Sequence, residues 1–205
     1  VANLHLAAQR WPIVIQTGGE IVLWFTVTLL VGWLGDTALS AQQVVNQYNL
    51  LIIIPIMGLT QASSILIGHA SGAKQYGEVK YLGYTHMGMG ICIMLIAMLF
   101  YLAAPNLLIH FYLRAESQTN PEVIHLAKML MAISAFSLLF DSLRNITIGA
   151  LRGLYDSRYP MYLSILLMWG LGLPLGCLLG FTWGLGVIGF ALANFLAVFL
   201  CEILL

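Results

Sequence analysis

The chain alternates between long apolar stretches and short polar segments. A membrane-spanning helix needs about 20 mainly apolar residues, and six stretches meet this requirement. They cover residues 11–34, 40–67, 82–104, 127–151, 161–180 and 186–205. Only helices or closed barrels satisfy their backbone groups in hydrocarbon, and the stretches are too long and continuous for barrel strands. The pattern therefore predicts an all-α polytopic membrane protein built as a six-transmembrane-helix bundle.

Basic residues are distributed unevenly over the segments that flank these spans. If the first span enters from the cytoplasm, the basic residues on the cytoplasmic side are Arg10, Lys74, Lys80, Arg152 and Arg158. Among the loops, only Arg114 then falls on the outer side. Cytoplasmic loops carry an excess of Lys and Arg, so we expect this orientation.

Composition agrees with a membrane protein, because 60% of the residues are hydrophobic and only 8% are charged. Eight basic and eight acidic residues cancel, which leaves no basic surface for nucleic acid. The lipid bilayer is the expected surrounding. The chain begins at Val1 and ends inside an apolar run, so we expect it to be part of a longer protein.

Two acidic residues, Glu20 and Asp141, lie deep inside apolar spans. A charged side chain at mid-depth costs about 2.5–3.5 kcal/mol on insertion scales, and such residues usually serve ion or proton pathways. Glu20 is ten residues from Arg10, and Asp141 is eleven from Arg152. At about 1.5 Å per residue, both acids lie at similar depths and could share one site. Two close carboxylates would take up a proton or bind a cation such as Na+.

The residues around Asp141 leave two interpretations open. Ser137 and Asn145 lie one helical turn before and after it, so they could complete an oxygen cage for Na+. The alternative is ordinary hydrogen bonding between helices, worth about 0.6 kcal/mol on average. Arg144 lies on the same helical face, and a cluster of Glu20, Arg144 and Asp141 could instead be a static ion-pair lock.

Polar and aromatic residues inside the spans indicate a cavity. Gln43, Asn46 and Gln47 fall on one helical face, and we expect this face to line a substrate cavity or a contact between helices. Trp24 and Trp169 could bind organic cations through their rings, or could simply belong to the core. Gly149 and Gly153 have the four-residue spacing that allows helices to approach closely.

Two segments resemble a known transporter family. The sequences GWLGDTALSAQQVVNQ and IPIMGLTQASSILIGHASGA look like the first hairpin of the C-terminal half of multidrug and toxic compound extrusion (MATE) transporters. The stretch FDSLRNITIGALRGLYDSRYPM, followed by GLGLPLG, is similar to the fourth and fifth helices of that half. The resemblance implies one lobe of a twelve-helix transporter, with a second, N-terminal six-helix lobe as its partner.

The same resemblance assigns roles to individual residues. It places Glu20 and Asp141 on the acidic positions of the family's seventh and tenth helices, where they would couple transport to Na+ or H+. Some family members carry a tyrosine where this chain has Ser137. A fixed positive charge on Arg144 would weaken Na+ binding beside Asp141.

The resemblance thus implies a cation-coupled multidrug efflux antiporter of the bacterial inner membrane that exports amphipathic organic cations. We expect no cofactor other than the coupling Na+ or H+, and no enzymatic activity, because motifs such as HExxH are absent. Two alternatives remain open. A flippase for lipid-linked oligosaccharides would need a more basic cavity, and a purely structural membrane subunit would not need its buried acids.

Overall fold

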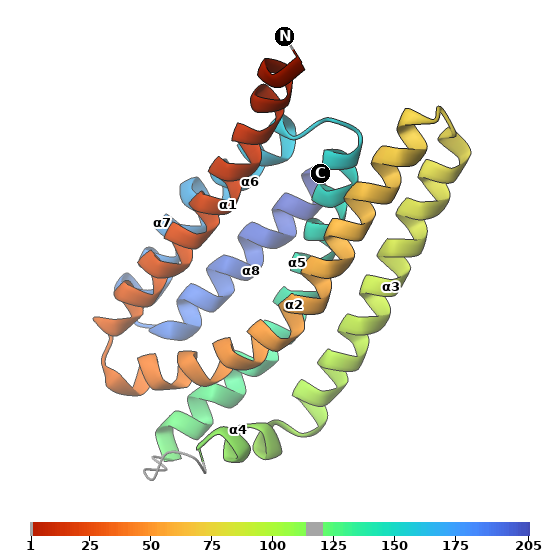
Figure 1. The fold of residues 1–205 in the computed structure, drawn as a ribbon. Helices are drawn as coiled ribbons and strands as arrows, with labels where there is room; N and C mark the ends of the chain where they lie inside the picture. Colours follow the sequence, from red (N-terminus) through yellow and green to blue (C-terminus); the bar gives the residue numbers. More distant parts are fainter. Residues whose placement is uncertain (1, 114–120) are drawn as a thin grey trace.

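The computed structural model describes residues 2–113 and 121–205, and within them it contains helices and no strand (Figure 1). The elements are α1 (Ala2–Gly32), α2 (Asp36–Gly72), α3 (Tyr76–Ala103), α4 (Pro105–Leu113), α5 (Pro121–Gly153), α6 (Arg158–Leu167), η1 (Met168–Gly172), α7 (Leu173–Cys177), η2 (Leu178–Thr182) and α8 (Val187–Leu204). Six helical segments in this part of the chain are long and apolar enough to cross a membrane. The predicted all-α polytopic membrane architecture is confirmed.

The helix α5 lies at the centre of the bundle and packs against α2, α3 and α8. Its glycines permit the closest of these contacts. A Cβ atom at Gly149 would lie 2.6 Å from the backbone oxygen of Thr60 on α2, and one at Gly153 would lie 2.7 Å from that of Ser64. Small residues at this spacing let helix backbones approach each other, as is common in membrane bundles. Gly149 and Gly153 therefore allow α5 to pack closely against α2 at the centre of the bundle.

The connections that carry basic residues gather at one end of the bundle. The turn between α2 and α3 and the turn between α5 and α6 both lie at the end where the chain starts (Figure 1). Lys74 occupies the first turn with a left-handed φ of 59°, and Arg152 lies in the last turn of α5. Lys74 and Arg152 thus lie at the same end of the bundle (Figure 1), and the side of the membrane that this end faces stays a prediction. Arg114 lies outside the described residues.

The fifth span is a helix with two wide turns rather than a uniform α-helix. Its run from Arg158 to Thr182 contains the π-helical segments η1 and η2. Pro174 has no backbone N–H and its ring crowds the preceding turn, so the ladder widens there, and Leu173 donates to the carbonyl of Met168, five residues back. Such π-bulges occur frequently at functional sites.

Two further features depart from six uniform spans. A short helix, α4, follows the third span and begins at Pro105, a residue whose fixed φ suits the first position of a helix. The helix α2 is bent part-way along its length (Figure 1). It contains Pro55, and sharp bends in long helices occur mainly at proline. Ile53, Ile56 and Met57, which flank Pro55, line a pocket between the helices.

Candidate functional site

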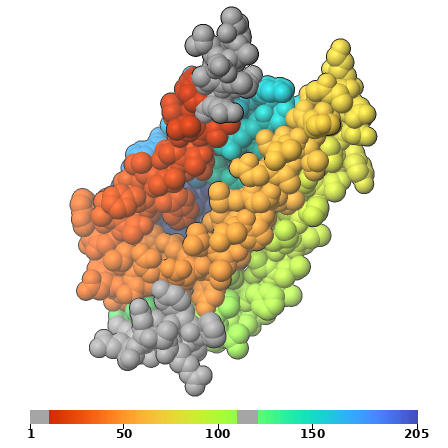
Figure 2. All heavy atoms as spheres, in the orientation of Figure 1, coloured from red at the N-terminus to blue at the C-terminus, as the bar shows by residue number. Residues whose placement is uncertain are grey.

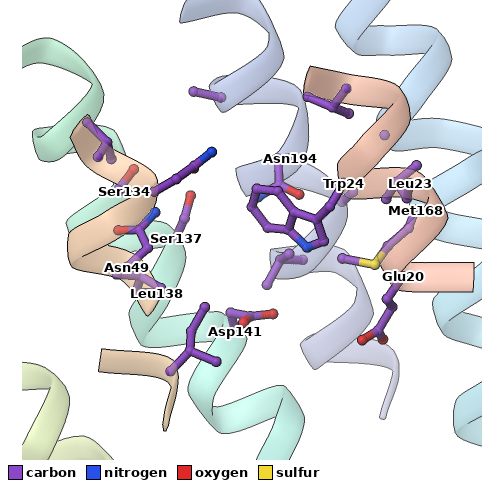
Figure 3. A pocket seen from close by; sticks show the side chains of 18 of the residues that line it. Glu20, Leu23, Trp24, Asn49, Ser134, Ser137, Leu138, Asp141, Met168 and Asn194 are labelled. Atoms are coloured by element: carbon purple, nitrogen blue, oxygen red, sulfur yellow. The ribbon is translucent and has the colours of Figure 1, made fainter. Parts of the chain in front are cut away.

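One pocket of about 230 Å³ lies between α1, α2, α5, α8 and the η1 region. Figure 2 shows a hollow between α1 and α2, with α8 visible at its floor. Glu20 from α1 and Asp141 from α5 both line this pocket, and Figure 3 shows their side chains approaching it from opposite walls. The two acids that the sequence placed at similar depths thus lie at one site.

Arg144 connects the two acids. Its Nη1 lies 2.9 Å from Oε1 of Glu20, and its Nη2 lies 2.8 Å from Oδ1 of Asp141. Its Nε also donates to Oδ1 of Asp141, at 3.2 Å. The arginine side chain is 3% exposed, whereas the glutamate and aspartate side chains are 26% and 21% exposed. The acids therefore border the pocket, and the cation that holds them together lies behind them.

A chain of hydrogen bonds extends this cluster toward the end of the bundle that carries Lys74 and Arg152. Gln16, one turn before Glu20 on α1, is 2% exposed. Its amide nitrogen donates to Ser164 on α6 at 3.2 Å and to Glu20 at 3.5 Å, and its Oε1 accepts a bond from Arg152 at 3.0 Å. The network fixes α1 against α5 and α6. A lone glutamine in an apolar span, one turn from the acid, was the sequence signal for it.

The two residues expected to complete an oxygen cage behave differently from each other. Asn145 turns its amide nitrogen toward Asp141 and donates to both the backbone oxygen, at 2.7 Å, and Oδ2, at 3.1 Å. Ser137 lines the pocket one turn away and is nearly buried. The structure thus contains the ion-pair cluster that the sequence left as an alternative.

The predicted polar face of α2 is rotated relative to the pocket. Asn46 lines the pocket, together with Gln42 and Asn49, whereas Gln43 and Gln47 are exposed on the outside of this chain. Asn46 belongs to both the predicted and the observed set, but the pocket-facing side of α2 includes Gln42 and Asn49 in place of Gln43 and Gln47, with Val44 and Val45 buried in the core. Contact of Gln43 and Gln47 with a substrate stays a prediction.

The two tryptophans also separate. Trp24 lines the pocket and is 43% exposed. Trp169 lies outside the pocket lining, and its Nε1 donates to the backbone oxygen of Gly19 at 3.2 Å. It packs against the cluster around Leu23 and Met168. In this chain Trp169 holds η1 against α1, which is the core role left open by the sequence.

A sequence profile described as MatE matches residues 12–178, a range that contains both acids, Arg144 and the π-helical segment η1. This chain belongs to the MatE family. A multidrug resistance protein NorM from Burkholderia vietnamiensis is 33% identical over 186 residues, which cover 90% of this chain and 40% of that protein. A probable NorM from Pseudomonas aeruginosa is 37% identical over 167 residues, covering 80% of this chain and 34% of that protein.

Solved structures of MATE proteins have the same fold as this MatE chain. A crystal structure of MATE in the straight conformation matches with a TM-score of 0.86 and 21% identity, over 97% of this chain and 43% of that one. An outward-facing multidrug resistance MATE family transporter matches with a TM-score of 0.81. The chain thus spans about 40% of the length of these relatives. It is a multi-pass membrane protein, and its bacterial relatives point to the plasma membrane.

Several polar pocket residues of this MatE chain were not predicted as site residues from the sequence. Gln42 and Asn49 on α2, Ser134 and Ser142 on α5, and Asn194 on α8 line the pocket. Asn194 is an isolated polar residue in the strongly apolar α8, which was the available signal. Ser134 lies one turn before Ser137, on the face that carries Asp141, so an extension of the expected oxygen-bearing face by one turn would have found it.

Proposed function

We propose that this chain is the C-terminal lobe of a cation-coupled multidrug efflux antiporter. The carrying observation is that Glu20 and Asp141, from two different helices, meet through Arg144 at the wall of a pocket inside the membrane span. Ionisable residues are rare inside membrane spans and usually mark a functional site. Relatives named multidrug resistance proteins, at 33% and 37% identity, support the transport assignment.

The coupling acts through the contact between α1 and α5. The ion pair of Arg144 with Glu20 ties these two helices together, so a cation that neutralises Glu20 weakens the tie. A bound ion shifts a conformational balance only by its differential affinity for the two states. In this proposal the affinity of Glu20 for a cation differs between the two states, because Glu20 contacts Arg144 only while α1 lies in the present arrangement.

The pocket chemistry favours amphipathic organic cations as substrates. Its described lining holds Glu20, Asp141 and Arg144 as its charged residues, an excess of one negative charge. Trp24 offers an aromatic face, and methionine and isoleucine side chains complete the apolar part of the wall. Aromatic rings and carboxylates together attract organic cations.

The size of the pocket supports a partner lobe. Pockets for drug-sized ligands are about 300–1,000 Å³, and the present one is about 230 Å³ and opens between α1 and α2 (Figure 2). In this proposal an N-terminal lobe closes that face and completes the cavity. Paired six-helix lobes around a central site are a common plan in transporters.

A flippase for lipid-linked oligosaccharides is less well supported. Phosphate recognition needs arginine or lysine donors that are open to the ligand. Arg144 is the basic residue among the described lining, and its donors are already directed at Glu20 and Asp141. The pocket offers a phosphate no unengaged guanidinium.

The test is dye efflux from proteoliposomes that hold the chain together with its partner lobe. A fluorescent cationic dye is followed under a Na+ gradient and, separately, under a proton gradient. The Glu20→Gln variant should fold but lose gradient-driven efflux. Glu78→Gln is the matched control, because Glu78 is exposed in the first turn of α3. Undiminished efflux by Glu20→Gln contradicts the coupling role, and absence of any driven efflux in the unmodified protein contradicts the transport proposal.

A further inference from the structure

We propose that Arg144 sets the ion specificity of this site by occupying the place that a Na+ ion would need between Glu20 and Asp141. In this view the guanidinium is the resident cation of the acid pair, and the site excludes Na+. The inference rests on the proposed function in so far as this acid pair is the coupling site. Four features of the described residues carry it.

The first feature is the direction of the hydrogen bonds around the carboxylates. Oδ1 of Asp141 accepts from Nε and Nη2 of Arg144, and Oδ2 accepts from the amide nitrogen of Asn145. Oε1 of Glu20 accepts from Nη1 of Arg144 and from the amide nitrogen of Gln16. Three carboxylate oxygens are thus bonded to N–H donors. Hard metal cations bind to oxygen atoms, so the residues as arranged do not fit Na+.

The second feature is the orientation of Asn145. Both partners of its Nδ2, the backbone oxygen and Oδ2 of Asp141, are acceptors. This pairing fixes which end of the amide is nitrogen, because an oxygen in that position would face two oxygens. Asn145 therefore adds a donor to the acid pair and takes away the carbonyl that an oxygen cage would use.

The third feature is charge. Glu20 and Asp141 carry two negative charges, and Arg144 and Arg152, which bonds to Gln16, carry two positive ones. From the other helices, Ser164 of α6 lies 3.4 Å from Nη1 of Arg144, and its Oγ lies 3.9 Å from Sγ of Cys201 on α8. Glu202 follows Cys201 in α8, and its Oε2 is buried without a hydrogen-bond partner among the described residues. A Na+ ion would add positive charge to a network whose bonded members are already balanced.

The fourth feature is the confinement of Arg144. Its side chain is 3% exposed, and all three of its nitrogens are engaged, with Nη1 also lying 3.4 Å from Oγ of Ser164. A buried charge that loses its partners is strongly destabilised, so Na+ cannot easily displace this side chain. A proton needs no coordination shell, and it is the coupling ion that this arrangement leaves.

The experiment measures Na+ binding directly, through the melting temperature of the detergent-purified protein with its partner lobe. Na+ is compared with K+ at equal ionic strength, for the unmodified protein, Arg144→Gln, the smaller Arg144→Ser and Arg152→Gln. Arg152→Gln is the matched control, because it removes one partly buried positive charge whose side chain bonds to Gln16 and not to either acid. We expect a Na+-specific rise in melting temperature in the Arg144 variants, and none in the unmodified protein or in Arg152→Gln.

Three results would overturn the proposal: a Na+-specific rise in the unmodified protein, its absence from both Arg144 variants when they are folded, or an equal rise in Arg152→Gln. Adding Asp141→Asn to Arg144→Gln should abolish the new Na+ effect, and persistence of the effect would place the ion elsewhere and contradict the assignment.

If neither Arg144 variant folds, dye efflux by the unmodified protein decides: efflux driven by Na+ overturns the proposal, and efflux driven only by protons supports it. No driven efflux at all contradicts the proposed function, while the melting experiment still tests the site.

Discussion

The guanidinium of Arg144 on α5 lies 2.9 Å from a carboxylate oxygen of Glu20 on α1. The ion pair between Arg144 and Asp141 lies within α5. The contact to Glu20 is therefore the ion pair that joins these two helices at the pocket. This contact depends on a buried arginine whose positive charge is balanced by the two acids.

Replacing Arg144 with Ala should destabilise the protein by about 3–5 kcal/mol, because it leaves the negative charges of Glu20 and Asp141 without their positively charged partner inside the bundle. A neutral set, in which Arg144→Met is combined with Glu20→Gln and Asp141→Asn, should recover most of this loss, since buried ion pairs are often no more stabilising than uncharged residues of similar volume. The measurement is unfolding in detergent without Na+. If the triple variant is as unstable as the single one, the loss comes from packing of the arginine stem and not from unpaired charge.

A second prediction concerns the contact between α5 and α2. A Cβ atom at Gly149 would lie 2.6 Å from the backbone oxygen and 2.9 Å from Cγ2 of Thr60, so Gly149→Ala must push the two helices apart. Overpacking of this kind costs about 1–3 kcal/mol. Gly58→Ala on α2 is the control, because a Cβ atom there meets nothing within 4 Å, and its effect should stay within about 0.5 kcal/mol. Equal melting temperatures for the two variants would show that the bundle yields at Gly149.

The sequence predicted the helices well because the rule behind them is strong. Backbone groups must be satisfied within hydrocarbon, and the apolar runs mark the six spans almost unaided. The same rule explains why the small helix α4 was missed, since its nine residues are too few to span. The widened turn before Pro174 was also beyond a hydropathy pattern, because it depends on which backbone bond the proline removes.

The site was predicted in part for a different reason. Counting residues from basic ends gave the depth of Glu20 and Asp141, and similar depth made a shared site possible. Rotation of a helix is not given by depth. The pocket is lined by Gln42 and Asn46 rather than by Gln43 and Gln47, because burial of Val44 and Val45 sets the rotation of α2. Whether Arg144 would reach across to Glu20 likewise depended on the packing of α1 against α5.

A third prediction concerns substrate recognition by Trp24, which lines the pocket near Glu20 (Figure 3). Trp24→Ala should raise KM for a cationic dye by about 2- to 30-fold, because a cation over an indole ring gains about 0.5–2 kcal/mol. Trp33→Ala is the matched control: Trp33 is 79% exposed beyond the end of α1 and lies outside the pocket lining. An uncharged analogue of the dye should be affected less than the cation. If both dyes lose affinity equally, Trp24 contributes apolar surface to the wall and no attraction for charge.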